Sequence, residues 1–338
     1  MHVLPIEDIV GLADERDLAV LRLLGRLEFV ASRWIKDLFF QDMDRATMFR
    51  RLGNLAKQGL VWYTQTTHTH MAPVTPGRRA PAPKSPYIYG LTPEGKHFLD
   101  ALDQEPHAPS WQALRTRDRR APAVPKAQLA HDLLGSSWCV SMIDAVRRCP
   151  MVDAIFCHVE YVSDPRQRID ALLVIRFNTQ QRLQTRPGWD IPWHDGSPDG
   201  PHHKTVRLAL EVDRSTEPLK TLLGKGLMYR TLTSEKVYDQ TLGGPVTPVF
   251  LVPPGKRAAQ IAREWQDAWP NGAGVISTPS KATHPLYGAL WGEYLTLKDT
   301  PPQSAKLLGS LVQNSDAWGK LVAHWVPNMP TATSKTAA

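Results

Sequence analysis

The sequence predicts a mixed α/β protein built from two domains. The chain has 338 residues, enough for two hydrophobic cores, and its 42% hydrophobic and 22% charged residues are typical of a globular protein. Apolar residues follow helical spacing over residues 14–58, whereas strand-like apolar runs alternate with helical stretches from residue 128 onward. A segment rich in Pro, His and Arg separates the two patterns. We therefore expect domains at residues 1–103 and 127–280, a basic linker at 104–126, and a C-terminal helix with a disordered tail at 281–338.

The first domain begins with a run of helices. Asp14 is placed to cap the first helix, whose apolar stripe comprises Leu18, Leu21, Leu24 and Leu27. A second helix is expected over residues 31–40. Asp44 is placed to cap a third, which covers residues 45–58 and stops at Gly59.

A predicted hairpin follows these helices. Strands at residues 60–64 and 87–91 flank a long polar excursion, and another helix begins near Thr92. Helices followed by a hairpin are the element order of a winged helix-turn-helix domain, which places its third helix in the major groove of DNA. The segment Gly90-Leu91-Thr92-Pro93-Glu94-Gly95 closely resembles the corresponding part of bacterial winged-helix regulators, as do Arg50-Arg51-Leu52 and Gly59-Leu60-Val61. This resemblance covers residues 14–103.

Basic residues in the first domain predict a double-stranded DNA partner. The net charge of +7 and the pI of about 9.3 favour a polyanionic ligand. Arginine can donate two hydrogen bonds to a guanine edge, so we expect base contacts from Arg45, Thr47 and Arg50 of the third helix. Phosphate contacts are expected from Arg51 and Lys57, and from the wing between the strands, which carries no acid and holds Arg78, Arg79 and Lys84.

The second domain alternates strands and helices. A helix is expected at residues 128–148, three strands at 154–160, 168–177 and 206–212, and then helix, strand, helix and strand at 218–232, 248–252, 257–269 and 274–277. The order indicates a sheet of mixed direction. It resembles the core of the restriction-endonuclease-like, or PD-(D/E)xK, fold.

Acidic residues stand at the ends of two predicted strands in this domain. Asp170 heads one hydrophobic strand, Glu211 ends another, and Asp213 follows two residues later. Carboxylates at neighbouring strand ends can converge on a hard divalent cation such as Mg²⁺, which activates water and neutralises a phosphate. Relative to the PD-(D/E)xK pattern, Ile169-Asp170 replaces Pro-Asp and Glu211-Val212-Asp213 lacks the lysine. The candidates to replace that lysine are Lys225 and Lys204.

Taken whole, the chain resembles the replication-relaxation family of bacterial plasmids and integrative elements. The resemblance rests on His131 in Gln128-Leu129-Ala130-His131, on Ile169-Asp170-Ala171-Leu172, and on Leu210-Glu211-Val212-Asp213-Arg214-Ser215-Thr216-Glu217. It covers most of residues 14–278. The family includes plasmid copy-control proteins and overlaps a class of conjugative relaxases that nick DNA with a metal and carboxylates. The resemblance therefore implies metal or catalytic roles for Asp170, Glu211 and Asp213, with Glu160 and Glu217 as second-rank candidates and His131 as a third.

Two functions follow from these observations. The first is a sequence-specific double-stranded DNA-binding regulator of transcription or replication on a bacterial mobile element, whose second domain forms a homodimer or grips DNA. The alternative is a Mg²⁺-dependent DNA nickase that uses Asp170, Glu211 and Asp213. The missing lysine favours the regulator and the retained acids favour the nickase. We prefer the regulator because the residues support DNA binding directly.

Other patterns exclude further classes of function. Three scattered cysteines form neither a disulfide framework nor a zinc motif, and no apolar run reaches the length of a membrane span. No Gly-rich phosphate loop is present, so we expect no nucleotide cofactor. The first residues lack a signal-peptide pattern, which favours a cytoplasmic protein without a membrane partner. Trp189 and Trp193 are expected to anchor a loop or core, with stacking on unpaired bases as the alternative.

Overall fold

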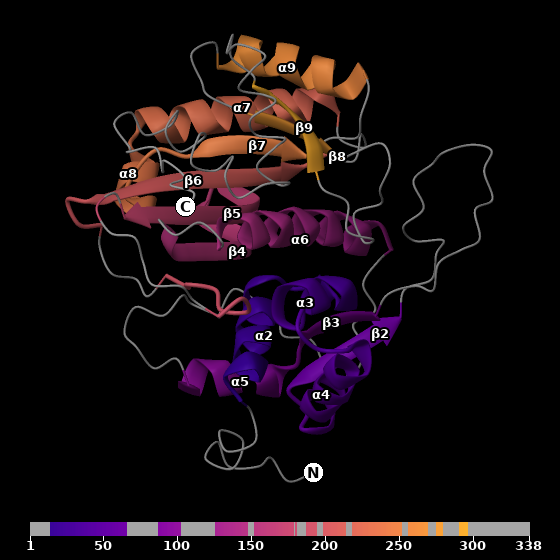
Figure 1. The fold of residues 1–338 in the computed structure, drawn as a ribbon. Helices are drawn as coiled ribbons and strands as arrows, with labels where there is room; N and C mark the ends of the chain where they lie inside the picture. The colour runs from indigo at the N-terminus through magenta and orange to yellow at the C-terminus, as the bar shows by residue number, and fades with distance from the viewer. Residues whose placement is uncertain are drawn as a thin grey trace, which may run out of the picture.

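The computed structural model describes residues 14–65, 87–102, 126–147, 152–178, 180, 187–194, 199–213, 218–251, 256–269, 275–279 and 291–296. These residues form a three-stranded sheet and a six-stranded sheet with helices packed against both, which confirms the mixed α/β class. Figure 1 shows the smaller sheet and the N-terminal helices as one layer and the larger sheet as another above it. We call them the small-sheet unit (residues 14–102) and the large-sheet unit (residues 126–296).

The small-sheet unit follows the element order expected from the sequence. Its elements are α2 (Glu15–Arg26), β1 (Val30–Ala31), α3 (Ser32–Phe39), α4 (Arg45–Lys57), β2 (Val61–Gln65), β3 (Tyr87–Leu91) and α5 (Pro93–Leu102). The short strand β1 was not expected, and it pairs antiparallel with β3, so the sheet order is β1-β3-β2.

Both predicted N-caps are confirmed. The Asp14 carboxylate accepts hydrogen bonds from the backbone N–H groups of Arg16 and Asp17, each at 3.0 Å. The Asp44 carboxylate accepts from the Thr47 N–H at 2.6 Å and so fixes the start of α4. The helix ends as expected, since Gly59 follows it with a φ of 78° in the left-handed region.

The threonine and glycine before and within α5 have a packing role. The Thr92 hydroxyl donates to the Gly59 carbonyl and accepts from the Gly95 N–H at 2.9 Å, which satisfies one of the unpaired donors at the helix start. A Cβ at Gly95 would lie 2.0 Å from the Leu60 carbonyl oxygen. This position therefore requires glycine, because α5 starts in direct contact with the backbone that follows α4.

The large-sheet unit alternates helices and strands. Its elements are α6 (Lys126–Val146), β4 (Val152–Asp164), β5 (Gln167–Asn178), β6 (His203–Val212), α7 (Leu219–Ser234), α8 (Val237–Leu242), β7 (Thr247–Leu251), α9 (Lys256–Ala268), β8 (Val275–Pro279) and β9 (Trp291–Thr296). The strands lie in the order β4-β5-β6-β7-β8-β9. Neighbours from β4 to β6 are antiparallel, β6 to β8 are parallel, and β9 is antiparallel to β8. The expected mixed direction is thus confirmed.

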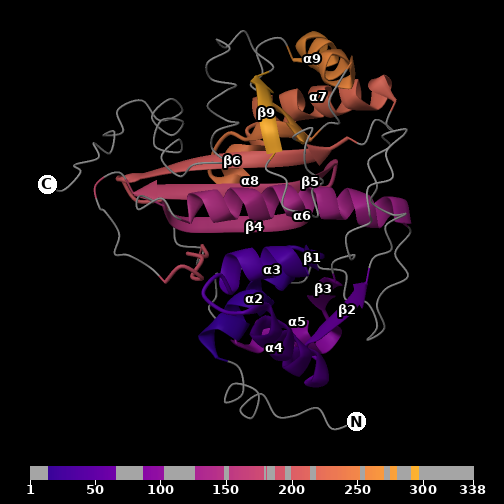
Figure 2. The ribbon, with the colours of Figure 1, turned by 45° about the vertical axis from the view of Figure 1, so that its right-hand side comes forward.

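Helices cover both faces of the large sheet. Leu208 and Leu210 of β6 belong to the hydrophobic cluster that includes α6, whereas Ala209 belongs to the cluster formed with α7 and α9. This alternation is the period of two expected for a strand buried on both faces. Figure 2 shows α6 in front of β4 and β5, and α7 and α9 above β6.

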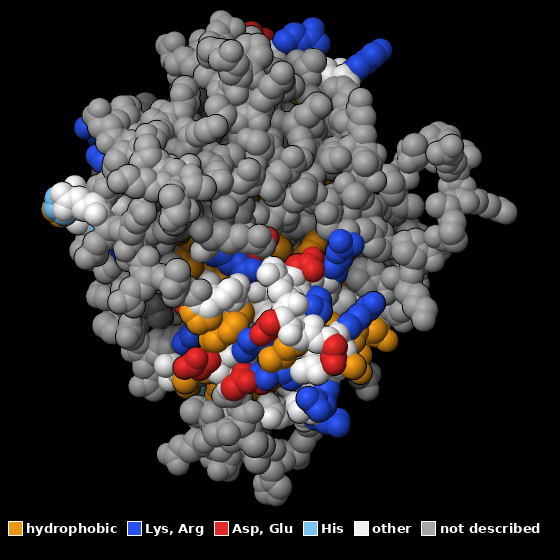
Figure 3. Space-filling model, in the orientation of Figure 1, with side chains coloured by type: hydrophobic (Ala, Val, Ile, Leu, Met, Phe, Trp, Pro, Cys, Tyr) orange, Lys and Arg blue, Asp and Glu red, His pale blue; other side chains and the backbone are white. Residues whose placement is uncertain are grey.

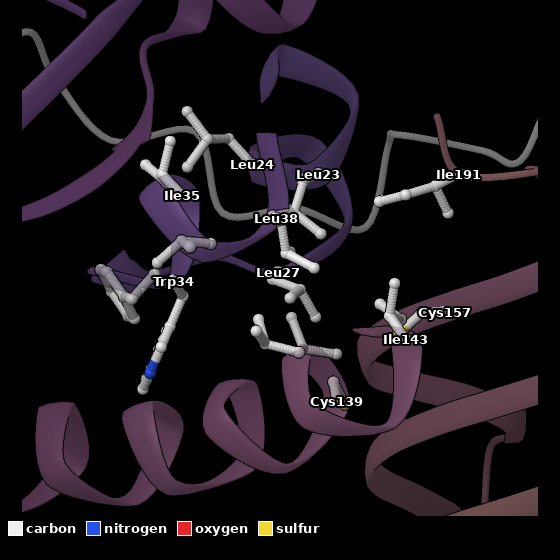
Figure 4. Close-up of a cluster of buried hydrophobic side chains, with 14 of the residues drawn as sticks. Leu23, Leu24, Leu27, Trp34, Ile35, Leu38, Cys139, Ile143, Cys157 and Ile191 are labelled. Carbon is white, nitrogen blue, oxygen red and sulfur yellow. The ribbon is translucent and has the colours of Figure 1, made fainter. Parts of the chain in front are cut away.

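One hydrophobic core joins the two units. Leu27 and Leu38 of the small-sheet unit lie in the same buried cluster as Cys139 and Ile143 of α6, and Figure 4 shows these side chains facing one another. Arg147, at the end of α6, is 3% exposed at its side chain and donates to the Leu38 carbonyl at 2.7 Å. Its guanidinium also donates to the Gly188 carbonyl. The linker expected from the sequence therefore does not separate two independent cores.

The structure departs from the sequence prediction mainly near the C-terminus. Strand β9 extends the large sheet past residue 280, where we expected that domain to end. The wing excursion and the expected linker lie outside the described residues, apart from their edges, and strand β9 is the described part of the segment where we expected a C-terminal helix and tail. No helix among the described residues is long and apolar enough to span a membrane. Cys139 and Cys157 are buried free thiols.

Candidate functional site

Charged side chains gather where β5 and β6 lie side by side near the end of β6. Asp170 comes from β5, Glu211 from β6, Lys225 and Tyr229 from α7, and His131 from α6. We call these five residues the carboxylate cluster. The antiparallel register pairs Ala171 with Leu210, which makes Asp170 and Glu211 cross-strand neighbours. The sequence prediction that these two acids come together agrees with this placement.

Glu211 lies on the α7 side of the sheet and is almost completely buried. It is 2% exposed. Tyr229 donates its hydroxyl to Oε1 at 2.7 Å, and the Lys225 ammonium lies 2.8 Å from Oε2. Burial raises the pKa of Glu211 to about 7, although the positive charge of Lys225 acts in the opposite direction. The carboxyl group of Glu211 can therefore gain or lose a proton near neutral pH.

Asp170 is held in its ionised form. Its Oδ2 accepts from the Val212 N–H at 2.7 Å and lies 3.4 Å from His131 Nε2. Burial acts to raise the pKa of Asp170, but the His131 hydrogen bond, the Lys225 charge and the Val212 N–H together lower it. For His131, burial acts to lower the pKa, but Asp132, 3.3 Å from Nδ1, and Asp170 raise it to about 10. His131 is thus an imidazolium at neutral pH.

The two lysine candidates differ in their placement. Lys225 extends from α7 to Glu211 and so supplies the cation that the sequence lacks at the lysine position of the PD-(D/E)xK pattern. Lys204 lies near the start of β6, where it pairs with Phe177, at the opposite end of the strand from Glu211. Sequence spacing could not choose between them, because the approach of Lys225 depends on how α7 crosses the sheet.

Asp213 pairs with a residue outside the carboxylate cluster. Strand β6 ends at Val212, and the Asp213 N–H bonds to the Leu251 carbonyl at 2.8 Å. The Asp213 side chain, 1% exposed, accepts from Arg257 Nε of α9 at 2.6 Å. Since α7 and α9 pack on the same face of the sheet, Glu211 and Asp213 both meet helices of that face but pair with different ones.

No metal cage is preformed in the parts of the chain that the structure describes. Within them, no group of three or more His, Cys, Asp or Glu side chains is arranged to hold a metal ion. Asp170 and Glu211 are the two acids of the carboxylate cluster, and their carboxylate oxygens could serve as ligands of a cation. Magnesium commonly keeps several waters and uses one or two carboxylates together with substrate phosphates, so this pair is a compatible donor set. The metal roles of Asp170, Glu211 and Asp213 stay predictions.

A small pocket lies beside the cluster, between the two units. Its lining includes Glu28 from the small-sheet unit and, from the large-sheet unit, His131, Asp132, Gly135, Ser136, Val159, Glu160, Asp170 and Val212. Glu160 has a φ of 51°, a left-handed conformation that is strained for a residue with a side chain, and its carboxylate pairs with Arg168. The second-rank candidate Glu160 thus borders the cluster, whereas Glu217 lies outside the described residues.

The third helix of the small-sheet unit presents a basic outer face. Met48, Leu52 and Leu55 of α4 are buried against the core, whereas Arg45, Arg50 and Lys57 are exposed and Thr47 is half-buried. The helix therefore has the inner apolar and outer basic faces that the sequence predicted. The wing residues Arg78, Arg79 and Lys84 lie outside the described residues.

Arg51 of α4 is committed to other residues of the small-sheet unit. Its Nε donates to Asp17 at 2.9 Å and its Nη2 to Asp14, and its side chain is 19% exposed. These bonds tie α4 to the start of α2. The phosphate contact that we expected from Arg51 stays a prediction, but the structure shows Arg51 in an internal role that the sequence did not indicate.

The comparisons with known proteins identify the family. No curated protein and no solved structure matches the chain. The family model described as replication-relaxation matches residues 21–246, more than half of the chain, and this range includes both α4 and the carboxylate cluster. The chain therefore belongs to the replication-relaxation family, which is associated with replication and with the processing of mobile-element DNA.

Proposed function

We propose that the protein is a sequence-specific double-stranded DNA-binding protein of a bacterial mobile element. In this proposal the small-sheet unit is a winged helix-turn-helix domain that binds DNA through α4 and the β2–β3 hairpin. The observation that carries it is the outer face of α4, where Arg45, Arg50 and Lys57 are exposed while the inner face is buried. A basic helix followed by a hairpin is the arrangement that enters the major groove in this class of domain.

Individual contacts follow from the placement of these side chains. Arg45, Thr47 and Arg50 occupy the first turns of α4, so they are the proposed base contacts. Lys57, near the other end of the helix, is a proposed phosphate contact. Arg51 acts mainly by holding α4 in position through Asp14 and Asp17. The proposal extends to the wing residues Arg78, Arg79 and Lys84 as backbone contacts.

The large-sheet unit supports the DNA-binding role in this proposal. We assign it a restriction-endonuclease-like fold, supported by a helix, three antiparallel strands, a crossover helix and a parallel strand in that order. Its role would be to form a homodimer or to grip DNA. Such a role accords with the internal pairing of its acids, since Asp213 is held by Arg257 and Glu211 by Lys225 and Tyr229.

Binding assays test the DNA-binding role. Fluorescence anisotropy would measure the affinity of the full chain for duplex DNA from its own genetic neighbourhood, over a range of salt concentrations. Arg50→Ala is expected to weaken binding about tenfold, as for the loss of a base-contacting arginine. The control is Arg33→Ala on α3, an exposed arginine paired with Asp37 at 3.6 Å. Equal affinities for wild type and Arg50→Ala would contradict the assignment of α4.

A second candidate function is Mg²⁺-dependent nicking of DNA. One observation favours it: Lys225 lies 2.8 Å from Glu211, beside Asp170, and so restores the acid-and-lysine set that a PD-(D/E)xK nuclease requires. When bound, a magnesium ion would supply an activated water and neutralise a phosphate. Asp170 and Glu211 would hold that ion. Lys225 would bring positive charge to the reacting phosphate, and His131 would keep Asp170 ionised.

A nicking assay separates the two candidates. The full chain would be incubated with supercoiled DNA from its genetic neighbourhood and Mg²⁺. The nickase predicts that wild type produces open circles and that Asp170→Ala, Glu211→Ala and Lys225→Ala abolish them. The matched control is Lys204→Ala, at the far end of β6. Specific binding without nicking would support the regulator and exclude the nickase.

A further inference from the structure

Aromatic side chains on the small-sheet unit form a second feature next to α4. Tyr63 on β2, Tyr87 on β3 and Phe49 on α4 lie in a row that ends at Arg45, and we call these four residues the aromatic ridge. Tyr63 is 53% exposed, although it is a large hydrophobic side chain. Figure 3 shows hydrophobic side chains next to Lys and Arg on this part of the surface.

Each member of the ridge is held by its neighbour. The ring centroids of Tyr63 and Tyr87 are 5.8 Å apart and their planes meet at 77°, and Phe49 packs against Tyr87 at 5.8 Å and 75°. The Arg45 guanidinium lies 5.2 Å from the centre of the Phe49 ring. Such edge contacts fix the orientation of the Tyr63 ring while half of its surface stays open to solvent.

The exposure of Tyr63 is not explained by the core. Trp62 and Ile88, which are 7% and 0% exposed, alternate with Tyr63 and Tyr87 along their strands and are buried on the other face of the sheet. On the face of the ridge, Tyr87 and Phe49 are partly buried against the core, whereas the Tyr63 side chain stays 53% exposed. An ordered aromatic surface beside cations is the combination that binds unpaired nucleobases, since each base offers a flat face and each nucleotide a phosphate.

The tryptophans that the sequence offered for base stacking have other partners. Arg26 lies 4.2 Å from the centre of a Trp193 ring, and Arg16 lies 5.6 Å from that of Trp189. Both tryptophans also pack against the shared core. They act as anchors of the segment at residues 187–194, and the aromatic ridge is the better surface for stacking.

We propose that the aromatic ridge binds unpaired bases of single-stranded DNA, with a base stacked on Tyr63 and a neighbouring phosphate held by Arg45, the cation of the ridge. This inference rests on the proposed DNA-binding role of the small-sheet unit. It goes further in naming the form of DNA, because a duplex keeps the faces of its bases stacked inside and leaves an aromatic surface nothing to stack on. The ridge would engage DNA where its strands are separated.

The experiment compares two oligonucleotides that differ only in their bases. Fluorescence anisotropy would measure binding of the full chain to labelled oligothymidine and to an abasic oligonucleotide of the same length, which keeps the phosphates. Wild type is expected to bind the oligothymidine about tenfold more tightly. Tyr63→Ala and Tyr63→Leu should remove this preference, whereas Tyr63→Phe, which keeps the ring, should retain it within about twofold. Leu227→Ala, at an apolar site of α7 that is 45% exposed, is the matched control.

Several results would overturn the proposal. Equal binding of the two oligonucleotides by wild type would do so, as would an unchanged preference in Tyr63→Ala. A loss of duplex affinity as large as the loss on oligothymidine would show that Tyr63 contacts the backbone instead. Failure of the proposed function is recognised by different results: Arg50→Ala would leave the affinity for duplex DNA unchanged, or wild type would bind no DNA. Thermal unfolding of each variant verifies that it is folded.

Discussion

The charged residues of α4 and those at the end of β6 were both singled out by the sequence, yet the fold uses them in different ways. On α4, Arg45, Arg50 and Lys57 are exposed. At the end of β6, Glu211 and Asp213 are each 2% exposed and each lies against a cation supplied by a helix. The surface charges can therefore contact a binding partner directly, whereas the buried carboxylates are neutralised by cations of the same chain.

This difference shows that a charge in a motif has two separate uses. A buried ion pair forms because both ions have lost water, so removal of one partner is costly even where the pair adds little net stability. An exposed charge contributes little to the stability of the fold and can instead interact with a binding partner. Substitutions at the two places should therefore change different measurements, and the predictions below run from the largest expected effect to the smallest.

The largest effect is expected from Arg257→Ala. This change leaves the buried Asp213 carboxylate without the guanidinium that donates to it at 2.6 Å. The free energy of unfolding should fall by about 3 kcal/mol, as measured by urea denaturation. Arg263→Ala, on the exposed side of the same helix, should change it by less than about 0.5 kcal/mol. A similar small change for Arg257→Ala would contradict the contrast between buried and exposed charges.

Glu211→Gln should flatten part of the pH profile of stability. The pKa of Glu211 is raised from 4.5 to about 7, so the folded state binds this proton more tightly than the unfolded state. Its contribution is complete below pH 4.5 and is lost as the pH rises through 7. Wild type should therefore lose about 3 kcal/mol more than Glu211→Gln between these limits. Urea denaturation at several pH values measures the difference, and parallel profiles would refute the prediction.

His131→Gln tests the cationic side of the same cluster at higher pH. The pKa of His131 is raised from 6.5 to about 10 by Asp132 and Asp170, against the effect of burial. The stabilisation from the imidazolium is thus complete below pH 6.5 and disappears as the pH rises through 10. Wild type should exceed His131→Gln by roughly 1.5 kcal/mol at pH 6, and the two should converge near pH 10. A difference that stays constant with pH would assign His131 a packing role.

The smallest expected change compares two adjacent arginines. Arg51→Ala removes the bonds to Asp14 and Asp17 and should lower the free energy of unfolding by about 1 kcal/mol. Arg50→Ala should leave stability within about 0.5 kcal/mol and lower the affinity for duplex DNA instead. Thermal unfolding and anisotropy on both variants make the comparison. The reverse pattern would exchange the roles assigned to Arg50 and Arg51.

Local signals in the sequence were enough for much of the fold. Asp14 and Asp44 cap the helices that they were predicted to cap, because an N-cap depends on the next few residues alone. Strands β5, β6 and β7 follow the predicted apolar runs closely, since burial on both faces leaves a continuous hydrophobic pattern. Asp170 and Glu211 could be placed together because they occupy neighbouring strand ends.

Other features depend on contacts between distant parts of the chain. Arg147 donates to a carbonyl 109 residues earlier, and Lys225 reaches Glu211 through the path of α7 across the sheet. The sequence analysis did not predict the ion pair of Asp213 with Arg257, because Arg257 follows the next strand along the chain. Hydrophobic periodicity carries no information on such pairings. Arg51 was likewise predicted to contact DNA, since its acidic partners Asp14 and Asp17 are far from it in the sequence and could not be recognised as its partners.

The hydrophobic core shared by the two units determines where this chain could be cut into fragments or joined to parts of a relative. A fragment ending at Leu102 would expose Leu27 and Leu38 to water, and one starting at α6 would expose Ile143 and leave Arg147 without the Leu38 carbonyl. The stretch that looks like a boundary in the sequence is thus a poor place to cut. A chimera that takes its small-sheet unit from a relative should fold only if α6 comes from the same relative. The two units should therefore change together in evolution.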